Sequence, residues 1–510
     1  MRLIAWPYLF AALLLATTET EASAQSEPAS MTAEQDHRQM MDQLGIQTLR
    51  PGVVNDAKAR ANPVNYDEAK ANPYPAWPDP LAYPDGRKVA TAAEWWSKRR
   101  PELVDVFERE IYGRIPATAP KVTWTVQTVD NETLGFTPIV ATRVVGHVDN
   151  AAAPAISVDI QMMIVKPVRA KSPMPALIMF PFGPVGFPAP APPSPDELAR
   201  MNAAWKAELA ARDPTLAAVF QAHPAWQPLT TSPFQAPPVD VEGNPPPLRQ
   251  LIADGWTVAL VEPNSIQPDS GAGLTRGVIG ISNQGRPRKP DDWGVLRAWA
   301  WGASRALDYL SADPDIDAKH VGIEGVSRYG KAALVAMALD QRFAMGLIAS
   351  SGESGTKPHR RNFGETVENQ TETGAYHWMA GAFLKYGAAD AATGPKTAND
   401  IPIESDELIA LAAPRMVFIS QGSPAGGDPP WIDQRGSYMA TVQAGKVWRL
   451  LGAKDLGVGD DYQHAEPPPI GTALVDCQLA WRQHSGGHTD APNVKTFIEW
   501  ADRLMGRDSH

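Results

Sequence analysis

The sequence GIEGVSRYGKAAL, residues 322–334, joins a short apolar run to a helix-like run through a single serine, Ser327. A serine at a sharp strand-to-helix turn exposes its hydroxyl above the sheet, beside the free N–H groups of the new helix. Serine nucleophiles are often held in this way within a G-x-S-x-G motif, but here the second glycine, Gly330, comes one position late. Ser327 is therefore a candidate nucleophile. The alternative is a turn that only starts a helix, with Ser327 as its cap.

Two basic residues follow this serine. Arg328 is its neighbour, and Lys331 comes four residues after Ser327, one helical turn on and on the same face. Cations at a helix N-terminus oppose the helix dipole, so their presence indicates a role other than stability. An arginine beside a nucleophile can direct a permanently charged donor at a developing oxyanion. The alternative is a pair of ordinary solvated charges.

Strand-like and helix-like runs alternate on both sides of this segment. Such alternation predicts an α/β fold made of βαβ units, with a mostly parallel central sheet in a three-layer α/β/α sandwich. The apolar run 175–183 is typical of a strand buried on both faces. We expect strands at 121–129, 156–167, 175–183, 255–263, 320–325, 343–352 and 414–422, and helices at 90–113, 291–310, 327–339, 435–451 and 493–505.

The 510 residues are interpreted as one large domain with additions. Residues 1–24 hold a short apolar run and end in the small-residue pattern Ala-Ser-Ala, which predicts a secretory signal peptide cleaved after Ala24. The run is too short to favour the alternative, a membrane anchor. We expect a partly ordered leader over 25–60, the main domain over 61–507, and a proline-rich insertion at 184–248.

Composition limits the classes of partner. The formal net charge of -11 argues against nucleic acid and anionic membranes. The single cysteine, Cys477, excludes an internal disulfide, so stability must come from the hydrophobic core. Histidines 359, 377 and 464 lack the spacing of metal ligands, and we expect no metal and no cofactor.

A serine nucleophile needs a histidine base and a carboxylate that orients the base. In an α/β-hydrolase they follow in the order serine, acid, histidine, with the histidine in a loop before the final helix. His488 in HSGGHTDAPN, residues 484–493, meets this description, and two glycines before it allow a tight loop. His484, in the same loop, is the rival.

The acid is expected after the strand at 414–422. Asp428 is the first carboxylate after that strand and Asp433 is the second, while Glu353 follows the preceding strand. We rank Asp428 first, Glu353 second and Asp433 third, because Asp433 is also well placed to cap the next helix.

Four segments together resemble the bacterial branch of the glucuronoyl esterase family, carbohydrate esterase family 15. The motif G-x-S-R-x-G-K is specific to this family among hydrolases and explains the late glycine. The resemblance implies an α/β-hydrolase fold and hydrolysis of esters that join glucuronic acid on xylan, often 4-O-methylated, to alcohol groups of lignin. The segments are NYDEAKANPYPAWPDPL (65–81), DDWGVLRAWAWGASRALDYL (291–310), GVSRYGKAAL (325–334) and RRNFGETV (360–367), with a looser match at GGHTD (486–490).

The resemblance also implies roles for individual residues. Ser327 would be the nucleophile, His488 the base, and Arg328 an oxyanion donor through its backbone N–H and its guanidinium. Three further residues would bind the sugar, the first two through its hydroxyls and the third by packing on the uronate: Lys331, Glu365 and Trp431.

The chain departs from the fungal members of that family. They carry a glutamate where this chain has Ser350, and they have disulfides, which this chain cannot form. Some bacterial members place the acid after the next strand, ahead of a tryptophan. That arrangement points again to Asp428 before Trp431, with one residue inserted in the D-P-P-W spacing.

We therefore expect a serine carboxylic-ester hydrolase that cleaves glucuronoyl esters on glucuronoxylan by two-step acyl transfer. Two alternatives stay open: a xylan acetyl esterase or other carbohydrate esterase, and an inactive carbohydrate-binding protein on a hydrolase fold. The expected protein is a secreted or periplasmic monomer without nucleic-acid or membrane partners. The insertion is expected to wall the substrate cleft.

Overall fold

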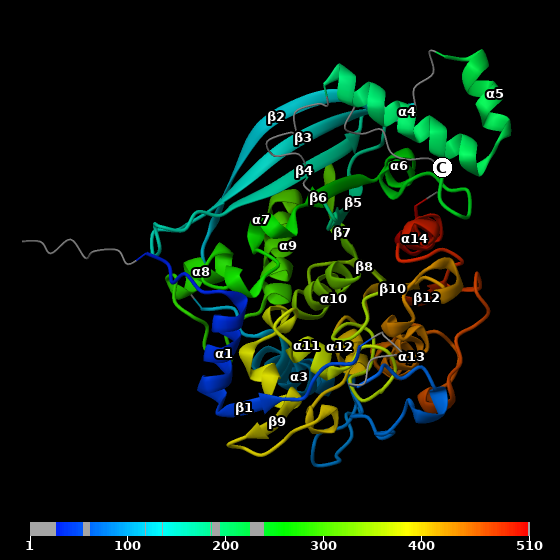
Figure 1. Ribbon diagram of the computed structural model, residues 1–510. Helices are drawn as coiled ribbons and strands as arrows, with labels where there is room; N and C mark the ends of the chain where they lie inside the picture. The colour runs from blue at the N-terminus through cyan, green and yellow to red at the C-terminus, as the bar shows by residue number, and fades with distance from the viewer. Residues whose placement is uncertain are drawn as a thin grey trace, which may run out of the picture.

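One mixed sheet of ten strands organises the part of the chain that the computed structural model describes, residues 27–54, 62–117, 119–134, 136–183, 185, 194–224 and 239–507 (Figure 1). The strand order is β11-β12-β10-β8-β7-β5-β6-β4-β3-β2. The predicted signal peptide lies outside the described residues. The strands are β2 (Val122–Leu134), β3 (Thr137–Val148), β4 (Asp159–Pro167), β5 (Met174–Met179), β6 (Thr257–Val261), β7 (Ile316–Val326), β8 (Met345–Ala349), β10 (Met416–Gln421), β11 (Ala473–Leu474) and β12 (Leu479–Gln483).

The strands from β12 to β6 all run in parallel, whereas β11 at one edge and β4, β3 and β2 at the other are antiparallel to their neighbours. This arrangement confirms the predicted α/β fold with a mostly parallel sheet. The two-residue strand β11 was not predicted, and neither were the longer strands β3 and β12. The polar residues Arg143, His147, Arg482 and Gln483 interrupt their apolar patterns.

The central strands contribute side chains to two hydrophobic layers, because successive side chains of a strand point to opposite faces of the sheet. In β10, Val417 and Ile419 belong to one layer and Phe418 belongs to the other. Helices α6 (Pro247–Ala253) and α14 (Ala491–Met505) complete the layer of Phe418. The opposite layer is completed by α9 (Val295–Ser311), α10 (Arg328–Leu339), α12 (Ser405–Ala410) and α13 (Gln434–Leu450).

The helix predicted over 90–113 forms with two interruptions. Helices α2 (Ala92–Glu94) and α3 (Arg100–Phe107) are each followed by a π-helical turn, Trp95–Arg99 and Glu108–Tyr112. Gly113 ends the run with φ 87°, and a Cβ there would lie 2.3 Å from the backbone of Asp292. Only glycine fits this conformation and this close approach.

The expected leader is more ordered in its described part than its weak pattern predicted. Helix α1 (Ala33–Leu44) packs on the body, and β1 (Ile46–Leu49) pairs antiparallel with β9 (Ala388–Ala391). The helix buries polar as well as apolar residues, and buried Asp36 accepts a 2.8 Å hydrogen bond from the Tyr376 hydroxyl. A helix whose buried side chains are partly polar has a short apolar stripe. Its sequence pattern therefore does not predict a helix.

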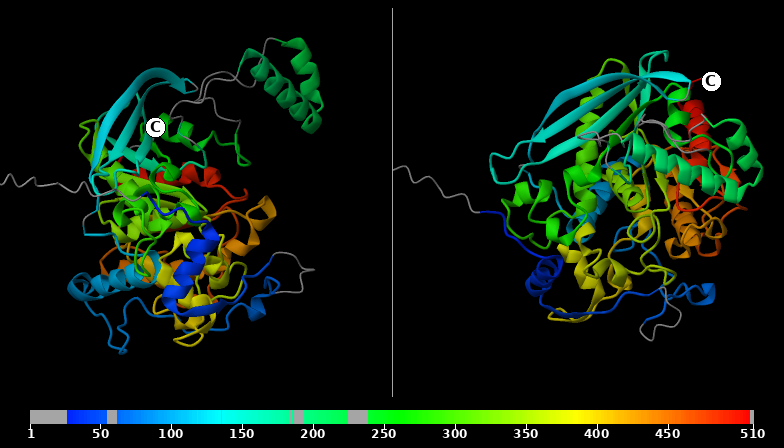
Figure 2. Two further views of the ribbon diagram at one scale, coloured as in Figure 1. Left: turned by 60° about the vertical axis from the view of Figure 1, so that its left-hand side comes forward. Right: turned by 45° about the horizontal axis from the view of Figure 1, so that its top comes forward.

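The insertion contains a helical hairpin that projects from the body (Figure 2). Its helices are α4 (Pro195–Arg212) and α5 (Thr215–Ala222). Ser194 caps α4 and forms a capping box with Glu197. Residues 184, 186–193 and 225–238 of the insertion lie outside the described part, and the chain returns to the body at α6.

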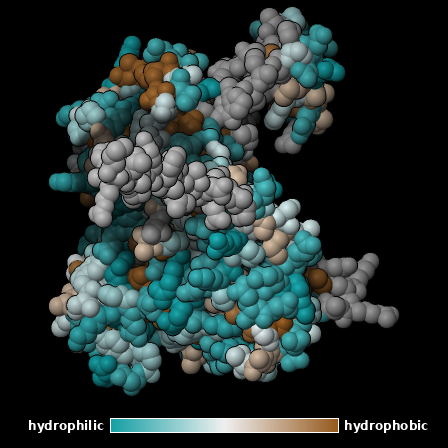
Figure 3. Space-filling view, turned by 90° about the vertical axis from the view of Figure 1, so that its left-hand side faces the viewer, coloured by the Kyte–Doolittle hydropathy of each residue, from teal (hydrophilic) through white to brown (hydrophobic). Residues whose placement is uncertain are grey.

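The surface over the antiparallel strands β2, β3 and β4 is the most apolar part of the face that Figure 3 shows. On β2, Val126 and Val129 are 48% and 59% exposed.

Of the helices within the described ranges, none combines the length and the apolar character needed to cross a membrane. The remaining α-helices are α7 (Pro263–Ile266), α8 (Gly277–Asn283) and α11 (Val367–Thr371).

Candidate active site

Ser327 lies in the turn between β7 and α10, with φ 60° and ψ -128°. A residue with a Cβ rarely adopts this conformation, and such strain is concentrated at functional sites. The two glycines permit it: a Cβ at Gly325 would lie 2.3 Å from the carbonyl oxygen of Tyr329, and one at Gly330 would lie 2.7 Å from that of Ala349. The late glycine therefore allows α10 to approach the end of β8.

Asp428 and His488 meet in the loops that follow β10 and β12. His488 Nδ1 lies 2.7 Å from Asp428 Oδ1, and the aspartate is fully buried whereas the His488 side chain is 30% exposed. The other oxygen, Oδ2, accepts from Ser350 Oγ at 2.8 Å, Gly422 N at 3.0 Å and Gln434 Nε2 at 3.2 Å. A carboxylate held by this many donors has a fixed orientation, so it fixes the imidazole as well.

The loops that carry these side chains open at the same edge of the sheet. In the parallel register Val326 of β7 pairs with Ala349 of β8, Ala349 pairs with Ser420 of β10, and Ser420 pairs with Arg482 of β12. Ser327 follows the first of these residues directly, and the carboxyl ends of parallel strands are where α/β proteins bind ligands. The strand ends therefore bring Ser327, Asp428 and His488 to one edge.

Arg328 opens α10, so its backbone N–H belongs to the first turn, where helical N–H groups lack intrahelical partners. Its guanidinium donates from Nη1 to Asp269 Oδ2 at 2.6 Å and lies 5.3 Å from the ring centroid of Trp378. The side chain is 42% exposed. Both donors of Arg328 are thus next to Ser327 in the chain, and the guanidinium is oriented by Asp269 and Trp378.

Lys331 and Glu365 form a polar pair with spare hydrogen-bonding capacity. Lys331 is 3% exposed, and its Nζ donates to the Ser351 carbonyl at 2.6 Å and lies 4.0 Å from Glu365 Oε2. Burial lowers the pKa of Lys331, and the charge of Glu365 opposes that shift. Glu365 Oε2 is buried and accepts no hydrogen bond from the residues that the structure describes. An ammonium with unused donors beside a carboxylate oxygen that accepts no hydrogen bond suits a ligand with hydroxyl groups.

Trp431 is joined to this pair through the backbone. Its carbonyl accepts from the Glu365 N–H at 3.1 Å, and it lies in the 3₁₀ turn Pro430–Ile432. Gly364, with φ 68°, approaches so closely that a Cβ there would lie 2.3 Å from the Trp431 Cα. The tryptophan therefore has a fixed place beside Glu365, in the loop that also carries Asp428.

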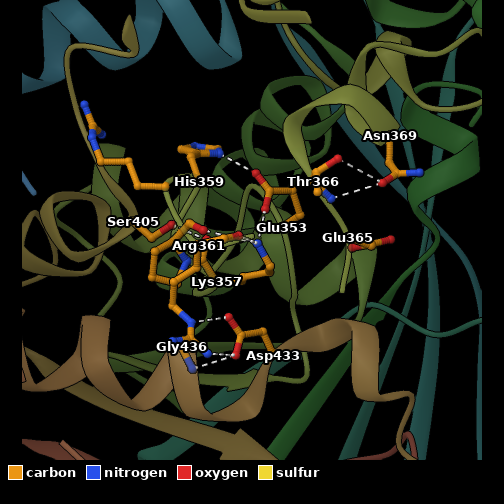
Figure 4. Close-up of polar contacts among 12 residues, drawn as sticks. Glu353, Lys357, His359, Arg361, Glu365, Thr366, Asn369, Ser405, Asp433 and Gly436 are labelled. Atoms are coloured by element: carbon orange, nitrogen blue, oxygen red, sulfur yellow. Dashed lines mark hydrogen bonds and ion pairs between the residues drawn. The ribbon is translucent and has the colours of Figure 1, made fainter. Parts of the chain in front are cut away.

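Glu353, the second-ranked acid, belongs to a separate buried cluster (Figure 4). Its Oε2 accepts from Lys357 Nζ at 2.7 Å and its Oε1 lies 2.5 Å from His359 Nδ1. Burial opposes its ionisation, but Lys357 and His359 together lower the pKa of Glu353. The histidine that it contacts is thus His359, whereas His488 is held by Asp428.

Asp433 and His484 have structural roles in the loops around the site. Asp433 caps α13 by accepting from the Gly436 N–H at 2.9 Å and pairs with Arg361 Nε at 2.7 Å (Figure 4). His484 is buried and accepts from the Gly486 N–H at Nδ1, 3.1 Å away, while its Nε2 lies 2.8 Å from the Thr489 carbonyl. Burial lowers the pKa of His484, which keeps the ring neutral for these bonds.

The partners that hold the site residues were not predicted from the sequence. Ser350 and Gln434 bind Asp428, and Asp269 binds Arg328. Asp269 follows β6 and α7, so a carboxylate shortly after a central strand was the available signal. Nothing in the sequence marks Gln434, which lies at the start of α13.

A family model and several known proteins match this chain over part or most of its length. The family model for fungal glucuronyl esterases matches residues 288–452, a range that includes Ser327, Glu365 and Asp428. The chain is 30% identical over 456 residues to carbohydrate esterase MZ0003 from an unknown prokaryotic organism, covering 88% of this chain and 94% of that protein. It is 33% identical over 171 residues to the 4-O-methyl-glucuronoyl methylesterase of Podospora anserina, covering 32% of this chain and 33% of that one.

A solved structure agrees over nearly the full length. A family 15 glucuronoyl esterase from Teredinibacter turnerae T7901 superposes with a TM-score of 0.76 at 36% sequence identity. The match covers 93% of this chain and 100% of that one. The similarity therefore extends well beyond the residues that the fungal family model matches.

Proposed function

This chain belongs to carbohydrate esterase family 15, the glucuronoyl esterases, and on that premise we propose that it hydrolyses esters of glucuronic acid, often 4-O-methylated, carried on glucuronoxylan. Family membership makes the chain a carboxylic ester hydrolase. The alcohol is a lignin-type alcohol group, and the reaction proceeds by serine-based acyl transfer. The observation that carries the proposal is the strained Ser327 turn at the same sheet edge as His488 and the buried Asp428 that it contacts.

The first step is formation of an acyl-enzyme. Asp428 holds the proton of His488 on Nδ1, so Nε2 is free to take the proton of the Ser327 hydroxyl. The Ser327 oxygen attacks the ester carbonyl, and the tetrahedral oxyanion is stabilised by the backbone N–H and the guanidinium of Arg328. When the intermediate collapses, the ester C–O bond breaks and His488 gives its proton to the leaving alcohol.

The second step is hydrolysis of the acyl-enzyme. A water molecule gives a proton to His488 Nε2 and attacks the same carbonyl carbon, and the oxyanion occupies the same donors. Breakage of the bond to Ser327 returns the proton from His488 to the serine oxygen. Glucuronate leaves, and the enzyme is restored. Asp428 stays ionised throughout and stabilises the imidazolium form of His488.

Recognition of the sugar rests on Lys331, Glu365 and Trp431. Sugar hydroxyls can accept from the unused N–H groups of Lys331 and donate to Glu365 Oε2, which lacks a hydrogen bond within the described residues, while the ring packs on Trp431. These contacts are useful to an enzyme whose acyl group is a sugar acid. An acetyl group offers no hydroxyl to them, which favours a glucuronoyl esterase over a xylan acetyl esterase.

The alternative of an inactive binding protein depended on Ser350 in place of a glutamate. In this chain the Ser350 hydroxyl donates to Asp428 at 2.8 Å, so the serine helps to hold a carboxylate supplied by the next strand. A histidine–carboxylate pair is present without that glutamate. This contact supports an active triad.

The test is a comparison of kcat/KM for benzyl glucuronate and for an aryl acetate on the purified protein. We expect the glucuronate to be preferred by at least about tenfold, since charged hydrogen bonds are worth about 1.5–3 kcal/mol. Preference for the acetate would refute the glucuronoyl assignment. We also propose export after cleavage at Ala24, which N-terminal sequencing of the secreted or periplasmic protein tests, and a cleft wall formed by the insertion.

A further inference from the structure

Asp269 is a mostly buried carboxylate that collects three side-chain donors beside the nucleophile turn. Its Oδ2 accepts from Arg328 Nη1 at 2.6 Å, and its Oδ1 accepts from Trp378 Nε1 at 2.6 Å and lies 2.9 Å from His377 Nε2. The Asp269 side chain is 15% exposed. Burial alone would raise its pKa, but His377, Trp378 and Arg328 together lower the pKa of Asp269 to about 2. The group is therefore a permanent anion with a fixed orientation.

Trp378 contacts Arg328 in a second way. Its ring centroid lies 5.3 Å from the Arg328 Cζ, while its indole N–H is bound to Asp269. The same ring lies 5.6 Å from Lys331 Nζ. One tryptophan thus offers its face to both cations and its N–H to Asp269, the carboxylate that pairs with Arg328. This geometry restricts the guanidinium from two directions.

The Asp269–Arg328 pair differs from an ordinary surface ion pair. Exposed pairs are worth about 0–1 kcal/mol, because both long side chains lose rotamer freedom and water screens the charges. Here His377 and Trp378 already hold Asp269 in place. Only the Arg328 side chain therefore loses rotamer freedom when the pair forms. The guanidinium has five N–H donors, and the bond from Nη1 to Asp269 uses one. Of the other four, the Nε–H is buried, and the three on Nη1 and Nη2 are available to a ligand.

We propose that Asp269, supported by His377 and Trp378, is a positioning residue that sets the Arg328 guanidinium for the oxyanion of the reaction. The inference rests on the proposed function, because it assumes that Arg328 is an oxyanion donor. Asp269 acts through Arg328, with no contact to the sugar required. Its removal should therefore reduce kcat, where the oxyanion develops, and leave KM nearly unchanged.

The first test is a double-mutant cycle on benzyl glucuronate. Asp269→Asn should lower kcat about tenfold, less than the about 100–1000-fold expected when an oxyanion donor is lost. In an Arg328→Ala background the same change should have an effect of less than about twofold, since the group that it positions is absent. An equal loss of kcat in both backgrounds would show that Asp269 does not act through Arg328.

A chemical rescue separates positioning from folding. Guanidinium chloride at tens of millimolar is far below its denaturing range, which is molar. In Arg328→Ala the free cation should bind between Asp269 and Trp378 and restore kcat several-fold. In Arg328→Ala/Asp269→Asn it should have no effect. The proposal is contradicted if guanidinium raises the kcat of both variants or of neither.

The chain offers a matched control at the other end of α10. Asp340 pairs with Arg342 at 2.6 Å, with side-chain exposures of 15% and 51% that resemble those of the Asp269–Arg328 pair. Asp340→Asn should leave kcat unchanged. If Asp269→Asn does not fold, Trp378→Phe keeps an aromatic face but removes the five-membered ring with its N–H to Asp269, and a fall in kcat of a few-fold is expected. Unchanged kcat in every Asp269 and Trp378 variant of an active enzyme refutes this inference alone, whereas a wild type without glucuronoyl esterase activity refutes the proposed function.

Discussion

Replacement of Asp428 by asparagine tests the triad at its most informative position. The three donors on Oδ2, from Ser350, Gly422 and Gln434, all require an acceptor. They should therefore fix the amide oxygen of the new side chain on that side. Its NH₂ group then faces His488 Nδ1, where the carboxylate Oδ1 was 2.7 Å away. Two donors cannot share a hydrogen bond, so His488 must move its proton to Nε2, the atom that should accept the serine proton.

The expected size of the effect follows from this geometry. Since Asp428 is fully buried, its charge attracts the imidazolium with little screening. At an effective dielectric constant of 20, two unit charges 4 Å apart attract by about 4 kcal/mol. The lost hydrogen bond adds about 1 kcal/mol. A total of about 5 kcal/mol corresponds to a fall in kcat of about 10⁴-fold.

The assay is steady-state hydrolysis of benzyl glucuronate, normalised to folded protein by circular dichroism. KM should change by less than about threefold, because the aspartate does not touch the substrate. Glu353→Gln is the control, since its carboxylate lies in the cluster with Lys357 and His359. That variant should lose stability, because it leaves a buried charge unpaired, but keep kcat per folded molecule. Loss of activity in Glu353→Gln with Asp428→Asn unaffected would refute the assignment of the acid.

Three further predictions concern the residues around the triad. Lys331→Met should lower kcat/KM for glucuronate esters by about 10–100-fold and leave an aryl acetate unaffected, since only the sugar loses a charged hydrogen bond; equal losses on both substrates would contradict a sugar-binding role. His488→Gln should lower kcat by about 10⁴-fold, whereas His484→Gln should keep it within about tenfold and lower the melting temperature, because His484 only supports the loop; the reverse order would exchange base and support. Burial raises the pKa of Asp490 and of its hydrogen-bonded neighbour Glu324, so the stability that Asp490 contributes is complete below its unfolded pKa and is lost as the pH rises through its raised pKa. Asp490→Asn should therefore reduce the fall in melting temperature between pH 4 and pH 8, and an unchanged slope would show that another group is responsible.

The central strands could be predicted because they are buried on both faces and are therefore continuous apolar runs. The same cue fails at the edges of the sheet. In β3 the buried and half-buried positions alternate, and Arg143 and Gly146 interrupt the pattern. Helix α1 was missed for a related reason, since Asp36 is buried against Tyr376, a residue far away in the sequence.

The order of serine, acid and histidine along the chain was enough to nominate Ser327, Asp428 and His488. Each of them follows a strand whose carboxyl end lies at the same sheet edge, and this is a property of the α/β rhythm. The cluster around Asp269 has no such rule, because it joins a loop after α7 to α10 and to Trp378, more than 100 residues later. Which loop side chains meet depends on packing that the order of residues does not encode.

The role of Ser327 is open to one direct measurement, the kcat of Ser327→Ala on benzyl glucuronate beside the wild type. The backbone of the turn is held by Gly325 and Gly330, so the variant should fold normally and bind the substrate. Its kcat should fall by about 10⁵–10⁶-fold, the loss typical of a removed serine nucleophile. A variant that keeps more than about one per cent of the wild-type kcat would show that the ester is cleaved without an acyl-serine intermediate.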